Sequence, residues 1–336
     1  MPDPTQFVDL RIRRFVSERL TPAIYREREQ LTVTSWDVPG EPVPFAEAVT
    51  QQFTPFRVGD EWSRPWGTTW FHITGTVPAD WEMTDARVEV LVDLGFVSGH
   101  PGFQAEGLVW TPEGHILKAI EPRNTAVPLK IGPGDSIDLY IEAASNPDVQ
   151  GESVYAPTPM GDLATSGDAP IYRTRVLDIG LRDVPVWELA QDVWTLDGLW
   201  RELGEEAPRR AEILRGLERL IDTLDPDDIS STAKAGREVL APLLASPAYA
   251  SAHHVVAVGH AHIDSAWLWP VRETIRKCAR TFSNVLSLMD ENDDFLFACS
   301  SAQQFAWMKE HYPDLFERIK VRVLEGRFVP VGGMWV

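Results

Sequence analysis

Residues 255–270 read Val-Val-Ala-Val-Gly-His-Ala-His-Ile-Asp-Ser-Ala-Trp-Leu-Trp-Pro, an apolar run that leads into two histidines, a carboxylate and two tryptophans. Four small or β-branched apolar residues that end at Gly259 are typical of a parallel strand covered on both faces. Polar residues directly after such a strand lie at its carboxyl end, where α/β sheets and barrels hold their active sites. The stretch therefore predicts a buried strand over 255–258 with functional residues just beyond it.

The residues after Ala252 alternate between strand and helix. The first element expected after the motif is a helix whose apolar face is Val271, Ile275, Ala279, Phe282, Leu286 and Met289. We then expect a strand at 295–299, helices on either side of Pro313, and a strand from 327 that runs into 332–336. This alternation predicts a parallel β/α barrel. Because a closed barrel takes roughly 200 to 250 residues, we expect residues 253–336 to form only the start of the barrel, which is truncated in this chain.

The rest of the chain predicts three further regions, so the fold class is multidomain, α/β plus β. Apolar periodicity over 8–28, with a break near Pro22, predicts an N-terminal helical arm over 1–50. Short β-rich runs separated by turn residues predict an antiparallel β-sandwich over 51–185; they are 69–73, 88–92, 107–110 and 136–141. Helical periodicity returns after 187, with Pro208 as a first-turn residue and a second helix that ends near Pro242, which predicts a helical connector over 186–252.

Composition excludes several classes of protein. The 336 residues are 44% hydrophobic, as in globular proteins, and carry a net charge of −19, which repels nucleic acids and anionic membrane surfaces. The sequence has no signal peptide and no segment long enough to span a bilayer, so we expect a cytoplasmic protein. Cys278 and Cys299 form no CxxC pair and are expected to be reduced core residues. The 13 tryptophans suit either core packing or the binding of sugar rings.

The pattern His260-x-His262-x-Asp264 is a candidate metal site. On an extended stretch, side chains two residues apart point the same way, so the imidazole of His262 and the carboxylate of Asp264 could converge on zinc or a similar divalent ion. The alternative is a hydrogen-bonded histidine and an aspartate that caps the following helix. The preceding strand and the nearby Trp267 and Trp269 favour the metal site.

Residues 259–270 resemble the signature of glycoside hydrolase family 38, the retaining α-mannosidases, and most closely its cytosolic branch. The resemblance extends to the stretches 300–305, 325–328 and 332–336. Residues 64–71 resemble the β-rich domain that precedes the barrel in this branch. The likeness thus covers essentially the whole chain.

This resemblance implies a role for each residue of the motif. His262 and Asp264 match zinc ligands, Trp267 matches the tryptophan on which the mannose ring stacks, and His260 matches a supporting position that does not bind the metal. In the family, the zinc also holds two sugar hydroxyls, which helps to distort the ring toward its transition state. The catalytic nucleophile is expected beyond Val336, so the resemblance implies no catalytic residue here and a chain that is inactive alone.

We therefore expect part of a zinc-dependent exo-α-mannosidase that acts on terminal α-mannosides of free oligosaccharides, with a homo-oligomer as a candidate assembly. One alternative is a metal-dependent carbohydrate deacetylase, which would use a metal-bound water in place of an aspartate nucleophile. The other is a non-catalytic fragment that binds carbohydrate or mediates oligomer contacts.

Overall fold

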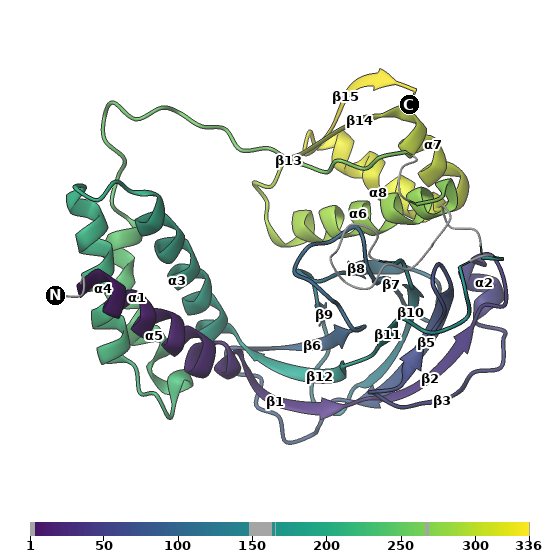
Figure 1. Cartoon of the computed structure of the whole chain (residues 1–336), viewed down its shortest axis with the longest axis horizontal. Coiled ribbons are helices and arrows are strands. Elements are labelled where there is room, and N and C mark those ends of the chain that lie inside the picture. Colours follow the sequence, from purple (N-terminus) through teal and green to yellow (C-terminus); the bar gives the residue numbers. More distant parts are fainter. Residues whose placement is uncertain (1–3, 148–162, 165, 266–268, 336) are drawn as a thin grey trace.

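The computed structural model of the chain describes residues 4–147, 163–164, 166–265 and 269–335. The chain forms a helical bundle, a β-sandwich and a mixed α/β unit, and the α/β unit lies on the sandwich (Figure 1). Among the described residues, no helix has the length and apolar character needed to cross a membrane.

The β-sandwich consists of two antiparallel sheets that enclose one apolar core. The first sheet has the order β1 (Tyr25–Gln30), β12 (Val176–Asp183), β6 (Ala86–Asp93) and β9 (Ala126–Leu129). The second has the order β3 (Thr54–Phe56), β2 (Thr32–Asp37), β5 (Thr68–Thr76), β10 (Ser136–Ala144), β7 (Glu106–Trp110) and β8 (Ile116–Ile120). Val90 and Ile179 of the first sheet pack with Phe71 and Ile141 of the second. The predicted antiparallel sandwich is confirmed, as are its four predicted strands.

Smaller elements complete the sandwich. The short strands β4 (Glu61–Trp62) and β11 (Tyr172–Arg173) pair with each other, and α2 (Phe45–Ala48) is a single helical turn. Trp62 is buried and donates from Nε1 to the carbonyl of Leu94 over 2.8 Å. This tryptophan is therefore a packing residue of the sandwich core.

The predicted helical arm over residues 1–50 is wrong beyond Ile24. Helix α1 (Pro4–Phe15) continues into a π-helical turn (Val16–Leu20) and a 3-10 turn (Pro22–Ile24), so the helix does break at Pro22. The chain then forms β1, which pairs with β12 in the first sheet, and β2, which pairs with β5 in the second sheet. Pairing with β12 and β5 outweighs the local helical pattern, because a strand gains ladder hydrogen bonds and packing that periodicity alone does not reveal.

The helical bundle combines α1 with three helices from the middle of the chain. These are α3 (Val184–Glu202), α4 (Pro208–Thr223) and α5 (Ile229–Leu244), whose shared core includes Leu189, Leu217 and Leu240. Helix α4 begins at Pro208 and α5 ends at Leu244, near Pro242, both as predicted. The buried Asp183 joins bundle and sandwich, because its carboxylate accepts hydrogen bonds from the Val186 amide at the start of α3 and from Arg26 of β1.

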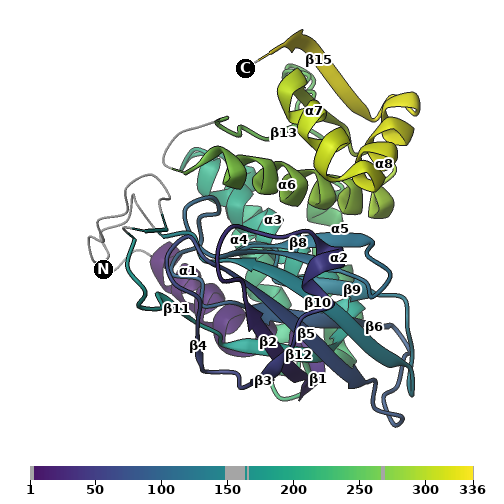
Figure 2. The ribbon, with the colours of Figure 1, turned by 90° about the vertical axis from the view of Figure 1, so that its right-hand side faces the viewer.

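The C-terminal unit is a three-stranded parallel sheet with helices. Strands β13 (Gly259–His260), β14 (Phe297–Ser301) and β15 (Phe328–Met334) pair in that order, and α6 (Val271–Glu291), α7 (Ala302–His311) and α8 (Pro313–Leu324) connect them. The strand and helix alternation predicted for this region is confirmed. Helix α6 lies along the second sheet of the sandwich, over β7 and β8 (Figure 2). One apolar core spans this contact, with Phe282 on α6 and Leu108 on β7.

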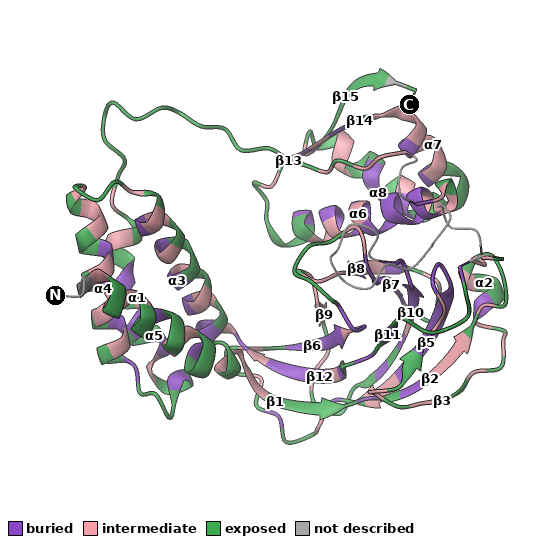
Figure 3. Cartoon of the chain, in the orientation of Figure 1, coloured by how far each residue is buried: buried purple, intermediate pink, exposed green. Residues whose placement is uncertain are grey.

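The predicted buried strand over 255–258 is wrong. Strand β13 begins only at Gly259, and Val255 and Val256 are 82% and 80% exposed. The exposed segment before β13 crosses from the helical bundle to the α/β unit (Figure 3). An apolar run becomes a buried strand only where other layers cover it, and no described element covers these side chains.

Candidate metal centre at the end of strand β13

The motif 260–264 begins within strand β13, whose last residue is His260, and continues past the carboxyl end of that strand. Gly259 and His260 pair with Phe297 and Ala298 of β14. The Nδ1 atom of His260 lies 2.8 Å from the carbonyl oxygen of Ala298, so this ring is tied to the neighbouring strand. That contact agrees with the supporting role expected of His260, which stays a prediction.

His262 and Asp264 come together in the loop after β13. Their Nε2 and Oδ1 atoms are 3.1 Å apart, and the two side chains are 81% and 33% exposed. Asp264 does not cap the following helix, because α6 begins at Val271 with Pro270 in the N-cap position. The capping alternative is therefore wrong for Asp264, whereas its hydrogen-bonded histidine is present, because His262 lies at hydrogen-bonding distance from Asp264.

The donor set of this pair fits zinc in type and spacing. An imidazole nitrogen and a carboxylate oxygen bound tetrahedrally to one zinc ion, at about 2.0 to 2.2 Å each, lie roughly 3.3 Å apart. The observed separation of 3.1 Å is close to that value. Within the described ranges no group of three histidine, cysteine or acidic side chains is clustered for a metal, so His262 and Asp264 are a partial ligand set. Trp267, the expected sugar-stacking residue, lies outside the described residues.

Side chains from α6 and α7 hold the backbone of this loop. Thr274 Oγ1 donates to the carbonyl of Ser265 over 3.0 Å and accepts from Trp269 Nε1 over 3.0 Å. From the other side, Gln304 Nε2 donates to the carbonyl of Ile263 over 3.1 Å. The residues on both sides of Asp264 are thus fixed by hydrogen bonds to helices.

A cavity of about 260 Å³ opens beside His262. Its walls come from two units of the fold: Glu106 and Glu121 belong to the sandwich side, whereas Trp269 and Lys277 belong to the α/β unit. A mixture of aromatic, acidic and basic groups around a concave surface suits a polar ligand such as a sugar.

Beneath the loop, α6 is joined to the sandwich by buried charges. Lys277 Nζ lies 2.8 Å from Glu106 Oε1, and Arg280 Nε lies 2.7 Å from Glu106 Oε2. Arg280 also pairs with Glu273. All four side chains are less than one-tenth exposed. Glu106 is on β7, so these ion pairs fix α6, and with it the candidate metal loop, to the sandwich.

The same cluster continues through Arg276, which lies 3.0 Å from Glu273 and 2.8 Å from Glu142 of β10. Asn146 adds a hydrogen bond of 2.8 Å to Glu273. Burial alone would raise the pKa of Glu273, but Arg280, Arg276 and Lys277 outweigh it and lower that pKa to about 2. Glu273 is therefore ionised at neutral pH.

Sequence reasoning missed this buried cluster, although a signal was present. Glu273, Arg276, Lys277 and Arg280 recur at the i, i+3, i+4 and i+7 spacing of a single helix face. Only the apolar stripe of α6 was predicted from the sequence, and no role was assigned to the charged positions next to it. Only the acidic residues Glu106 and Glu142, more than 100 residues earlier in the sequence, make burial of these charges possible.

The two units that form the walls of the cavity beside His262 match two different protein families. Residues 252–336 match the family described as glycosyl hydrolases family 38 N-terminal domain. Residues 28–173, which hold most of the sandwich, match the family described as alpha-mannosidase, jelly roll domain. Both walls of the cavity beside His262 thus come from segments with mannosidase relatives.

Full-length relatives are similar along most of this chain. It is 33% identical to Alpha-mannosidase 2C1 of Mus musculus over 97% of the chain and 31% of the relative. It is 34% identical to Alpha-mannosidase 2C1 of Homo sapiens over 88% of the chain and 27% of the relative. The chain spans less than a third of these relatives. A solved Faecalibacterium prausnitzii Beta-glucuronidase also aligns, with a TM-score of 0.27 and 16% identity over 47% of this chain and 32% of that one, too low to bear on fold or function.

Proposed function

We propose, on the premise that this chain belongs to glycosyl hydrolase family 38, that the protein is a metal-dependent exo-α-mannosidase in which His262 and Asp264 hold a divalent cation, zinc by preference. The observation that carries the proposal is the 3.1 Å approach of His262 Nε2 to Asp264 Oδ1 at the end of a parallel strand, inside the segment that matches the family. Names of relatives support the substrate class, a terminal α-mannoside.

The proposal assigns a role to the loop residues, to the side chains that hold the loop and to the cavity beside it. His262 and Asp264 bind the cation, Thr274 and Gln304 fix the loop backbone, and the cavity beside His262 receives part of the sugar. A bound zinc ion supplies Lewis-acid polarisation of sugar hydroxyls. We propose that Trp267 stacks on the mannose ring. Retaining hydrolysis needs two carboxylates about 5 Å apart, and we assign neither of them to a residue of this chain.

The setting of the enzyme is also a proposal. A net charge of −19 suits a neutral substrate better than a phosphorylated or nucleic-acid one. We propose free mannose-containing oligosaccharides as substrates, the cytoplasm as the location and a homo-oligomer as the assembly. The start of a β/α barrel, of which β13, β14 and β15 would be the first strands, completes the proposed architecture.

The experiment measures release of 4-nitrophenol from 4-nitrophenyl α-mannoside by the protein expressed from its natural gene. We expect a chelator to abolish the activity, zinc to restore it, and Asp264→Ala to remove it. For residues 1–336 alone we expect metal binding without turnover. Activity that survives chelation would refute the metal dependence, and release of acetate from acetylated sugars in place of mannose would favour a deacetylase.

A further inference from the structure

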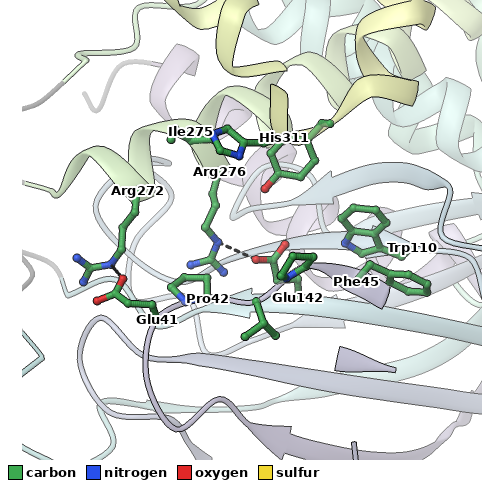
Figure 4. Close-up of a pocket in the computed structure, with 12 residues that line it drawn as sticks. Glu41, Pro42, Phe45, Trp110, Glu142, Arg272, Ile275, Arg276 and His311 are labelled. Carbon is green, nitrogen blue, oxygen red and sulfur yellow. Dashed lines mark ion pairs between the residues drawn. The ribbon is translucent and has the colours of Figure 1, made fainter. Parts of the chain in front are cut away.

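A second cavity, of about 310 Å³, lies between the sandwich and the α/β unit (Figure 4). Its walls are the segment 41–45, one residue each of β7 and β10, the start of α6, the last residue of α7, His311, and Tyr312 between α7 and α8. It shares no lining residue with the cavity beside His262. It is therefore a separate hollow, independent of the candidate metal centre.

Two ion pairs cross this cavity from one unit to the other. Arg276 Nε lies 2.8 Å from Glu142 Oε1, and both side chains are buried. Closer to solvent, Arg272 Nε lies 2.8 Å from Glu41 Oε2. Two carboxylates and two guanidinium groups balance, so these four residues present no net charge to a ligand.

Two residues of the cavity walls, Trp110 and Arg276, carry buried donors that lack a hydrogen-bond acceptor among the described residues. Trp110 Nε1 and Arg276 Nη2 are buried and make no hydrogen bond within the described part of the chain. The two residues are 8% and 5% exposed, and both line the cavity. They lie on either side of the Glu142 carboxylate (Figure 4). A buried donor without an acceptor is costly, and such groups normally find a partner.

The remaining walls are apolar and aromatic. The ring of Phe45 stacks on that of Trp110 with centroids 5.2 Å apart, and Val43 and Ile275 line the cavity beside them. Such surfaces suit the C–H faces of a sugar ring. A hydroxyl group can accept from an indole or guanidinium N–H and can donate to a carboxylate.

We propose that this cavity binds one neutral pyranose ring at a site distinct from the metal centre. Its hydroxyls accept hydrogen bonds from Trp110 and Arg276 and donate to Glu142. Because Glu41 and Glu142 already pair with Arg272 and Arg276, a charged ligand would find no unpaired opposite charge in this cavity. The site thus selects an uncharged sugar, and it requires neither a metal nor a catalytic reaction.

The test uses saturation-transfer NMR and calorimetry to measure the binding of methyl α-mannopyranoside to residues 1–336 after treatment with a chelator. We expect binding that chelation does not change, and we expect mannose 6-phosphate and mannosamine to bind at least tenfold more weakly. Trp110→Phe keeps an aromatic ring but removes the N–H, and should weaken binding about fivefold.

Trp70→Phe is a matched control. Trp70 lies in the same aromatic group, 6.2 Å from Trp110 between ring centroids, and its buried Nε1 also has no partner in the described chain. It does not line the cavity. Binding by this variant should stay within twofold of the original.

Glu41→Gln provides a second variant, because Glu41 is largely exposed and its replacement leaves the core intact. It gives the cavity a positive charge, so it should hardly change binding of the neutral mannoside but should narrow the discrimination against mannose 6-phosphate. The proposal fails if no methyl α-mannopyranoside binds, if the charged sugars bind equally well, if Trp110→Phe and Trp70→Phe behave alike, or if binding disappears on chelation. That last result would assign the sugar to the His262 centre.

Discussion

Thr274, in the first turn of α6, donates a hydrogen bond of 3.0 Å to the backbone carbonyl of Ser265, the residue after Asp264. Helix α6 is in turn fixed to the sandwich through Glu106 and Lys277. The position of the candidate metal ligand Asp264 therefore depends on the contact between two units of the fold, and not on its own loop alone.

Replacing Thr274 by valine tests this dependence. The substitution keeps the shape of the side chain but removes the donor to Ser265 and the acceptor of Trp269 Nε1. Loss of these two hydrogen bonds should lower the free energy of unfolding by about 1 to 3 kcal/mol. Zinc affinity, measured by calorimetry, should fall as well. Thr195→Val, which replaces an exposed threonine of α3 that donates to a carbonyl of its own helix, is the control and should change neither; equal effects of the two variants would show that the hydrogen bonds have no special role.

Glu273→Gln should strongly destabilise the contact between α6 and the sandwich. Glu273 faces Arg276 and Arg280 in the buried cluster, and loss of its charge leaves these cations incompletely paired. Breaking a buried ion pair costs about 3 to 5 kcal/mol. Urea denaturation measures this loss.

Glu317→Gln is the control for that variant, because Glu317 pairs with Lys320 at 2.7 Å on the surface. An exposed pair contributes about 0 to 1 kcal/mol, so the midpoint of denaturation should hardly move. Equal destabilisation by the two substitutions would contradict the importance given to the buried cluster.

The stability contributed by Glu273 should depend on pH. The pKa of Glu273 is lowered from 4.5 to about 2 in the folded protein. Because the folded pKa lies below the unfolded one, ionised Glu273 stabilises the fold fully above pH 4.5, and this contribution is lost as the pH falls toward 2. The stability difference between the original chain and Glu273→Gln should therefore shrink over this interval. A difference that stays constant from pH 5 to pH 2.5 would refute the shifted pKa.

The two cysteines should be unreactive in the folded protein. Cys278 and Cys299 are both buried free thiols, and burial raises the pKa of Cys278 to about 12. Since the thiolate is the reactive form, a thiol reagent at pH 8 should label neither residue until the chain is unfolded in denaturant, when both react. Rapid labelling of the native protein would show that α6 or β14 opens readily.

Sequence reasoning recovered the parts of this structure that are specified locally. The strands at 88–92 and 136–141 are apolar, β-rich runs bounded by turn residues, and α6 has a long apolar stripe. The approach of His262 to Asp264 followed from their spacing of two residues on an extended stretch.

The features that were missed depend on partners distant in sequence. Strand β1 exists because Glu29 pairs with Ile179, and the run 255–258 is exposed because no described layer covers it. The charges of α6 are buried because Glu106 and Glu142 face them. Local periodicity contains no information about any of these contacts.

The most direct test of the metal centre is a zinc-edge anomalous difference map from crystals of the chain grown with zinc. The expected result is a peak within bonding distance of both His262 Nε2 and Asp264 Oδ1 that disappears in Asp264→Ala and persists in His254→Ala, a substitution of an exposed histidine outside the motif. A map with no peak at this pair, or with zinc bound only at other histidines, would contradict the account.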